Sequence, residues 1–158
     1  MLMLLLASLL ACTGPSGNDT AGDTAPAIAT GPGTLALSFR IDDDYIATMA
    51  KGGEAPVGPF YGSCFREDDA TATGPVEGAL PLFDLEVPLD LTPDGGPTGM
   101  LYTTTPLDPQ IVWILGCLDS DANGCDEGDP ITLPNENKFQ IAAEAETANE
   151  IYFGMLRP

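Results

Sequence analysis

The residues best suited to chemistry lie in one acidic segment, CLDSDANGCDEGDP, at positions 117–130. Five carboxylates and one Asn fall within its eleven residues 119–129. Calcium takes about six to eight oxygen ligands at roughly 2.3–2.6 Å in a flexible geometry. The segment is therefore either a calcium-binding loop or an acidic turn at the surface.

The spacing of the acidic residues favours the calcium loop. Asp119, Asp121 and Asn123 occupy the first, third and fifth positions of a D-x-D-x-N-G pattern. Gly124 stands at the sixth position, where a tight turn needs a backbone without a side-chain penalty. Cys125 stands at the seventh, where such loops use the backbone carbonyl as a ligand.

The end of the segment departs from the EF-hand pattern. Its twelfth position is Pro130 instead of a bidentate Glu, and no helical pattern flanks it. We expect Asp129 or Asp126 to close the site, and a bound ion to be structural. The alternative is a bare acidic hairpin, because Asn-Gly forms turns by itself; repulsion among the carboxylates opposes it unless a cation or solvent screens them. The expected ligands are Asp119, Asp121, Asn123, Cys125, Asp126 and Asp129.

Catalytic groups are scarce elsewhere. The chain has no His, which excludes Ser-His and Cys-His nucleophile pairs and H-E-x-x-H metal sites. Paired carboxylates could hydrolyse glycosides, but the single Trp, Trp113, lies in an apolar run and is expected to pack in the core. A Cys64 nucleophile would lack a base. We predict no enzymatic activity and no catalytic residue.

The first eleven residues, MLMLLLASLLA, form an apolar run that is too short to span a bilayer, which needs ~20 residues. The run has the length of a signal-peptide core. Leu9-Leu10-Ala11-Cys12 resembles the lipobox of bacterial lipoproteins. That resemblance implies removal of residues 1–11 and lipidation of Cys12. Because Thr13 is not the Asp that favours inner-membrane retention, it further implies export to the outer membrane of the cell envelope.

Residues 12–33 are small, polar and rich in Gly and Pro, so we expect a flexible linker. Residues 34–158 suit one folded domain. The net charge is -19, which excludes nucleic acid as a partner and makes divalent cations natural counter-ions. High acidity also serves solubility.

Alternating apolar residues predict several short strands, and Gly/Pro turns separate them. Residues 85–91 contain Pro88, which restricts that strand to a sheet edge, and residues 111–118 read as a central strand. A short helix is possible over residues 44–50. We predict an all-β fold, a single antiparallel β-sandwich with at most one short helix. The expected strands are residues 34–41, 85–91, 111–118, 138–143 and 150–156.

Residues 111–158, with a strand ending in Asp119 and the acidic loop after it, resemble the prealbumin-like B-type repeats of bacterial surface proteins. That resemblance implies a prealbumin- or immunoglobulin-like sandwich. Three cysteines remain besides Cys12, which allows one disulfide and one free thiol in an oxidising compartment. Cys117 could pair with Cys125 across the loop, or Cys64 could pair with either.

These observations predict a non-enzymatic, membrane-anchored surface lipoprotein, a structural or adhesive module with a calcium loop. The alternative is a module of the cell envelope that binds a small ligand or carbohydrate. Four aromatic residues near Gly-rich turns could form a contact patch, although core or edge packing is the commoner role: Tyr45, Phe60, Tyr61 and Phe65. An envelope protein is another possible partner.

Overall fold

The computed structural model describes residues 29–94 and 99–158. Cys12, the predicted signal peptide and most of the predicted linker lie outside the described residues. The described chain is all-β with one α-helix, as predicted. Its strands are β1 (Thr34–Ile41), β2 (Val57–Arg66), β3 (Ala70–Thr71), β4 (Gly74–Pro75), β5 (Phe83–Asp90), β6 (Tyr102–Thr103), β7 (Ile111–Leu118), β8 (Pro130–Thr132), β9 (Lys138–Gln140) and β10 (Glu146–Leu156). The helices are α1 (Asp43–Gly52) and the 3₁₀ turns η1 (Glu67–Asp69) and η2 (Pro134–Glu136).

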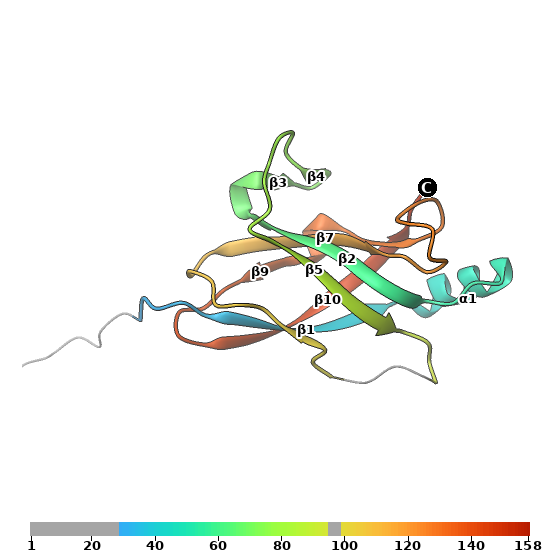
Figure 1. The fold of residues 1–158 in the computed structure, drawn as a ribbon, viewed down its shortest axis with the longest axis horizontal. Coiled ribbons are helices and arrows are strands. Elements are labelled where there is room, and N and C mark those ends of the chain that lie inside the picture. The colour runs from blue at the N-terminus through green and yellow to red at the C-terminus, as the bar shows by residue number, and fades with distance from the viewer. Residues whose placement is uncertain (1–28, 95–98) are drawn as a thin grey trace, which may run out of the picture.

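Eight strands form one continuous sheet in the order β5-β2-β7-β8-β10-β1-β6, with β9 also paired to β7. The sheet folds over itself, so that β5, β2 and β7 cross above β10 and β1 (Figure 1). The short β8 connects the two layers by pairing with both β7 and β10. All pairings are antiparallel except that of β1 with β10. These are the first and last of the described strands in the sequence, and they lie side by side and run parallel. This sandwich-like arrangement agrees with the predicted fold class.

The strand pattern in the sequence identifies the core. Leu35 and Leu37 of β1 are fully buried, as are Ile151 and Phe153 of β10 in the same layer. Phe60 of β2 packs edge-on against Phe153, with ring centroids 5.6 Å apart. Since these side chains come from both layers, the interior between them is one apolar core.

Two predictions about strand position are confirmed. The strand that contains Pro88 is β5, and it lies at the edge of the sheet. Proline is tolerated there because it lacks the N–H that an interior ladder requires. The run over residues 111–118 is β7, which lies inside the sheet and pairs with β2, β8 and β9.

The sequence patterns missed or misplaced several features. They did not predict β2, whose Gly58, Pro59 and Gly62 read as turn residues. The strand expected over 138–143 ends at Gln140, and the last strand begins earlier than expected, at Glu146. A shift in register between Phe153 and Met155 marks a bulge, and Met155 is 37 % exposed although alternation predicted it beside Phe153.

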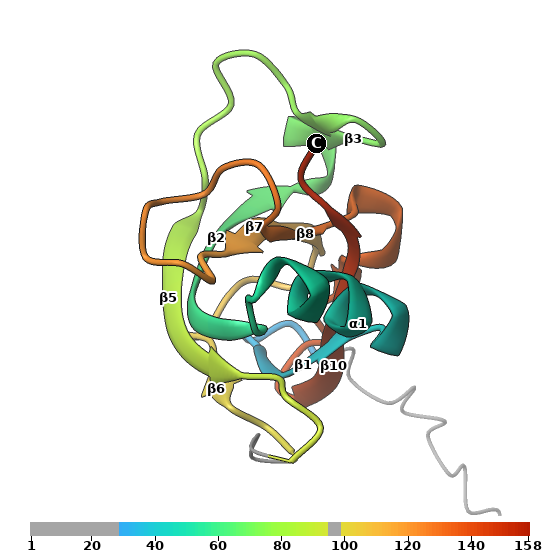
Figure 2. The same ribbon diagram turned by 90° about the vertical axis from the view of Figure 1, so that its right-hand side faces the viewer.

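Helix α1 is longer than the predicted span of residues 44–50. Asp43 and Asp44 lie in its first turn and Lys51 in its last, which suits the helix dipole at both ends. Gly53 ends the helix with φ 87°, a left-handed conformation that glycine adopts without steric cost. Met49 anchors the helix to the core, and α1 lies across one end of the sandwich (Figure 2).

Candidate functional site

The register of β7 and β8 brings two acidic residues together. Cys117 of β7 pairs with Ile131 of β8 in an antiparallel ladder. Continuing that register by two residues on each strand places Asp119 opposite Asp129. The nine residues between them, 120–128, leave and return at the same end of the sheet, so the acidic segment is a closed loop.

Backbone contacts fix both ends of this loop. The Asp119 amide donates to the Pro59 carbonyl at 3.0 Å. A Cβ on Gly58 would lie 1.9 Å from the Asp119 carbonyl oxygen, so only glycine permits this close approach. At the other end, the Arg157 amide donates to the Asp129 carbonyl at 2.7 Å. The backbones that carry the carboxylates of Asp119 and Asp129 are therefore held in place by hydrogen bonds to neighbouring segments of the chain.

Asp119, Asp121 and Asp129 each direct a carboxylate oxygen to a common place, and these three oxygens lie within 4.8 Å of one another. Asp119 is 5 % exposed and Asp129 is 2 % exposed, whereas Asp121 faces solvent. Ionised carboxylates at such separations repel one another, and the repulsion is strongest for the buried pair, which water screens least. The electrostatic potential at the end of β7 is thus strongly negative.

The hydrogen bonds of the two buried carboxylates differ. Asp129 accepts from the Ser120 amide at 2.9 Å and from the Ser120 hydroxyl at 2.8 Å through Oδ1, and from the Asp126 amide at 3.1 Å through Oδ2. Within the described part of the chain, the Asp119 carboxylate accepts only one long bond, from the Gly124 amide to Oδ2 at 3.3 Å. Its Oδ1 is buried and has no hydrogen-bond partner among the described residues. A buried carboxylate oxygen without a partner is costly, and a cation would satisfy it.

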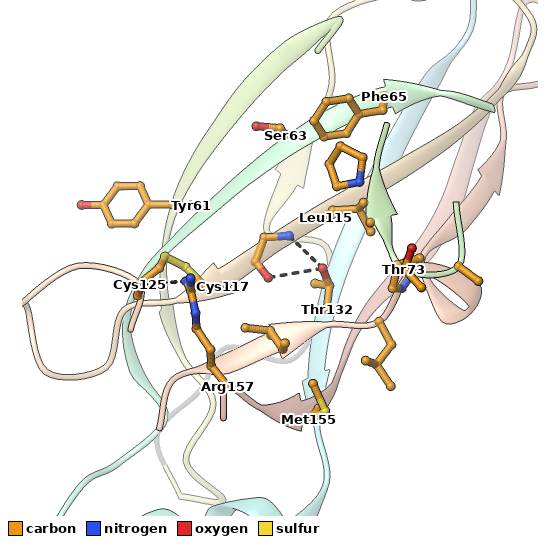
Figure 3. A pocket seen from close by; sticks show the side chains of 17 residues that line it. Tyr61, Ser63, Phe65, Thr73, Leu115, Cys117, Cys125, Thr132, Met155 and Arg157 are labelled. Atoms are coloured by element: carbon orange, nitrogen blue, oxygen red, sulfur yellow. Dashed lines mark hydrogen bonds between the residues drawn. A yellow bond between two sulfur atoms is a disulfide. The ribbon is translucent and has the colours of Figure 1, made fainter. Parts of the chain in front are cut away.

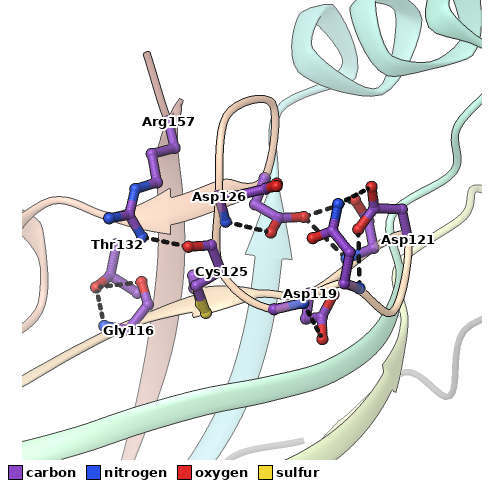
Figure 4. Close-up of a disulfide and its surroundings, with 12 residues drawn as sticks. Gly116, Asp119, Asp121, Cys125, Asp126, Thr132 and Arg157 are labelled. Carbon is purple, nitrogen blue, oxygen red and sulfur yellow. Dashed lines mark hydrogen bonds between the residues drawn. A yellow bond between two sulfur atoms is a disulfide. The ribbon is translucent and has the colours of Figure 1, made fainter.

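The other three predicted ligands make different contacts, and Figure 4 labels two of them, Cys125 and Asp126. Asn123 donates its amide nitrogen to Asp121 Oδ2 at 2.7 Å. The Cys125 carbonyl accepts from Arg157 Nη1 at 2.6 Å. Asp126 contributes its backbone N–H to Asp129 and is not among the three clustered carboxylates. The geometry thus groups the carboxylates of Asp119, Asp121 and Asp129.

A disulfide joins Cys117 to Cys125, with Cα atoms 6.0 Å apart (Figures 3 and 4). This is one of the pairings that the sequence allowed, and it ties the loop back onto β7. Cys64 is a free, buried thiol. Burial raises the pKa of Cys64 to about 12, so its thiolate, which is the nucleophilic form, is strongly disfavoured.

The four aromatic residues considered as a contact patch do not form one. Phe60 is fully buried and Phe65 is 7 % exposed. The Tyr45 hydroxyl donates to the Gly154 carbonyl at 2.8 Å, which holds that ring against the fold. Tyr61 alone among them is well exposed, at 41 %.

The sequence patterns missed two residues that shape the loop. Ser120 gives two hydrogen bonds to Asp129, and Arg157 binds the loop through its backbone and its guanidinium group. Ser120 lies inside the predicted motif, where its role as a local donor could have been suspected. Arg157 lies 32 residues after Cys125, and only knowledge of the β8–β10 pairing would have connected them.

The sequence matches no known family of proteins, and neither a curated protein nor a solved structure matches it. The resemblances to lipoproteins and to B-type repeats therefore stay predictions. Among the described residues, no helix has the length and apolar character that crossing a membrane requires.

Proposed function

We propose that this protein is a non-enzymatic lipoprotein of the bacterial cell envelope, a structural or adhesive β-sandwich module with one calcium ion bound in its acidic loop. The observation that carries the calcium site is the buried, unpartnered Oδ1 of Asp119 beside the carboxylates of Asp121 and Asp129. Hard oxygen ligands of this kind suit calcium. The ion would order the connection between β7 and β8.

The carboxylate cluster supports a binding role more than a catalytic one. Two carboxylates that hydrolyse a glycoside flank the substrate at about 5–9.5 Å across a cleft. Here three carboxylate oxygens crowd within 4.8 Å, and Asp119 and Asp129 are buried in the loop. The Cys64 thiol, buried and with its pKa raised to about 12, is a poor nucleophile.

The lipid anchor rests on the sequence alone. An apolar run followed directly by Cys12 and a Gly- and Pro-rich segment suits a domain held at a distance from a membrane. The net charge of -19 keeps such a domain off the anionic membrane surface. The linker would therefore present the sandwich to the surroundings of the cell.

Two measurements test this proposal. Titration calorimetry of the full chain with CaCl₂ should show one site that is lost in Asp119→Asn and kept in Asp126→Asn, which removes the same charge from the same loop. Equal binding by both variants, or no binding by the wild type, would refute the calcium site. Mass spectrometry after expression in a diderm bacterium should show an acylated Cys12 at the N-terminus, absent in Cys12→Ser. A chain that still begins at Met1 and carries no lipid would refute the anchor.

A further inference from the structure

The outer face of the β2–β7 layer is unusually apolar. Residues opposite one another on this face are Tyr61 with Cys117, Ser63 with Leu115, and Phe65 with Trp113. In a two-layer sandwich the outer face is normally polar, because it meets water. This face therefore needs a cover or a ligand.

The described residues cover only half of that face. Phe65 and Trp113 pack under the connection that contains η1, β3 and β4, where Ala70 completes a small second core. The Trp113 indole N–H donates to the Glu67 carbonyl at 3.0 Å, which fixes this cover. The cover ends at Leu115, and nothing within residues 29–94 and 99–158 closes off the rest of the face.

The open half is a groove of about 700 Å³ between the β3–β4 turn and the disulfide (Figure 3). That volume lies within the range of roughly 300–1,000 Å³ typical of small-molecule sites. Leu115, Ile131 and the disulfide line it, together with Tyr61 and Met155, which are 41 % and 37 % exposed. The bulge in β10 shapes this groove. It shifts the register after Phe153, so that the Met155 side chain lines the groove instead of pointing into the core.

One charged side chain, Arg157, lines the groove among the described residues. Three other cationic side chains, Arg40, Arg66 and Lys138, form ion pairs. Arg157 forms none within the described part of the chain; its Nη1 bonds the Cys125 carbonyl, which leaves its other N–H groups available. An unpaired guanidinium group at the end of an apolar groove is complementary to an apolar molecule with one anionic group.

We propose that this groove binds an apolar organic anion, with the apolar body on Leu115, Ile131 and Met155 and the anionic group on Arg157. A second copy of the chain fits less well, because two chains of net charge -19 repel each other across a whole interface, whereas a small ligand brings one anionic group directly to Arg157. A carbohydrate would bring many hydroxyl groups that the mostly apolar lining could not satisfy. The groove adjoins the acidic loop through the disulfide and Arg157, but none of the three clustered carboxylates lines it.

The probe is 8-anilinonaphthalene-1-sulfonate, an apolar sulfonate, and its neutral counterpart is N-phenyl-1-naphthylamine. Binding to the full chain is read from quenching of Trp113, the single Trp. We expect Arg157→Gln to weaken sulfonate binding about tenfold and to leave binding of the neutral probe within about twofold. Arg66→Gln, which removes the same charge away from the groove, should change neither.

Met155→Glu provides a second variant, because it alters an exposed position outside the acidic loop and should fold normally. It should weaken sulfonate binding at least tenfold, whereas Met155→Lys should not weaken it. If the wild type binds neither probe, or if Arg157→Gln and Met155→Glu leave sulfonate binding unchanged, the proposal is overturned. Self-association that Met155→Glu abolishes, without probe binding, would assign the groove to a second copy instead.

Discussion

Gly62 of β2 lies directly opposite Gly116 of β7, and the Phe60 ring covers both. A Cβ on Gly116 would lie 2.2 Å from the Tyr61 carbonyl oxygen, and a Cβ on Gly62 would lie 2.5 Å from the Phe60 ring. The glycine pair therefore leaves the space that the ring fills at the centre of the core, where it also contacts Phe39 and Phe153.

Gly116→Ala should destabilise the protein by more than about 3 kcal/mol, because the new methyl group meets backbone that cannot move without breaking the β2–β7 ladder. Gly52→Ala is the matched control, since nothing lies within 4 Å of its added Cβ. Alanine at that helical position should be neutral or stabilising by up to about 1 kcal/mol. Urea denaturation measures both, and equal stability of the two variants would contradict this packing.

Removal of the disulfide should loosen the acidic loop. Cys125 lies eight positions after Cys117, and closing a loop of that size corresponds to about 2–3 kcal/mol in the chain-entropy description. The variant Cys117→Ser/Cys125→Ser should lose that amount in urea denaturation and should bind calcium more weakly. Unchanged calcium affinity would show that the strand register alone positions the carboxylates.

The buried Cys64 thiol should make stability depend on alkaline pH. Its pKa rises from 9.0 to about 12 on folding because burial disfavours the thiolate. The folded protein thus holds a proton that the unfolded chain releases above about pH 9. This contribution to stability is complete below pH 9 and falls by up to about 1.4 kcal/mol per pH unit above it.

The measurement compares the free energy of unfolding of the wild type with that of Cys64→Ala at pH 8 and at pH 10. The advantage of the wild type should shrink between the two values. In a Cys12→Ser background, iodoacetamide should label Cys64 only after denaturation. A constant advantage, or rapid labelling of the native protein at pH 8, would be inconsistent with a buried thiol.

The parts of the fold that the sequence predicted are those set by local pattern. Alternation in residues 34–41 and 111–118 located β1 and β7 with their bounds, and Pro88 placed its strand at an edge. Strand β2 was missed because Gly58 and Gly62 look like turn residues. They are glycines because a neighbouring backbone or ring approaches them closely, and that contact is made by residues distant in the chain.

The candidate site also has features that local sequence predicted and features that depend on residues distant in the chain. The spacing of the loop predicted Asp119, Asp121 and Asn123 as ligands and left either Asp126 or Asp129 to close the site; the structure groups the carboxylates of Asp119, Asp121 and Asp129. Gly124 has the positive φ, 98°, expected at the sixth position. Which oxygen lacks a partner could not be predicted, because that depends on burial by other strands. The contact of Arg157 with the loop likewise depends on how β10 pairs with β8.

The most direct test of the calcium site is thermal unfolding of the wild type, Asp119→Asn and Asp126→Asn, each in 1 mM calcium and in chelator. In chelator, Asp119→Asn should melt higher than the wild type, because an amide nitrogen in place of the unpartnered Oδ1 can donate to the neighbouring carboxylates. Calcium at 100 times its Kd should stabilise the wild type by about 2.7 kcal/mol and so raise its melting temperature. In calcium the wild type should therefore melt higher than Asp119→Asn.

Asp126→Asn should respond to calcium as the wild type does, since its carboxylate lies outside the cluster. A calcium-dependent crossing of the Asp119→Asn and wild-type melting temperatures is the result expected of a bound ion. Melting curves of the wild type that coincide in calcium and in chelator would contradict it and leave the segment an acidic turn.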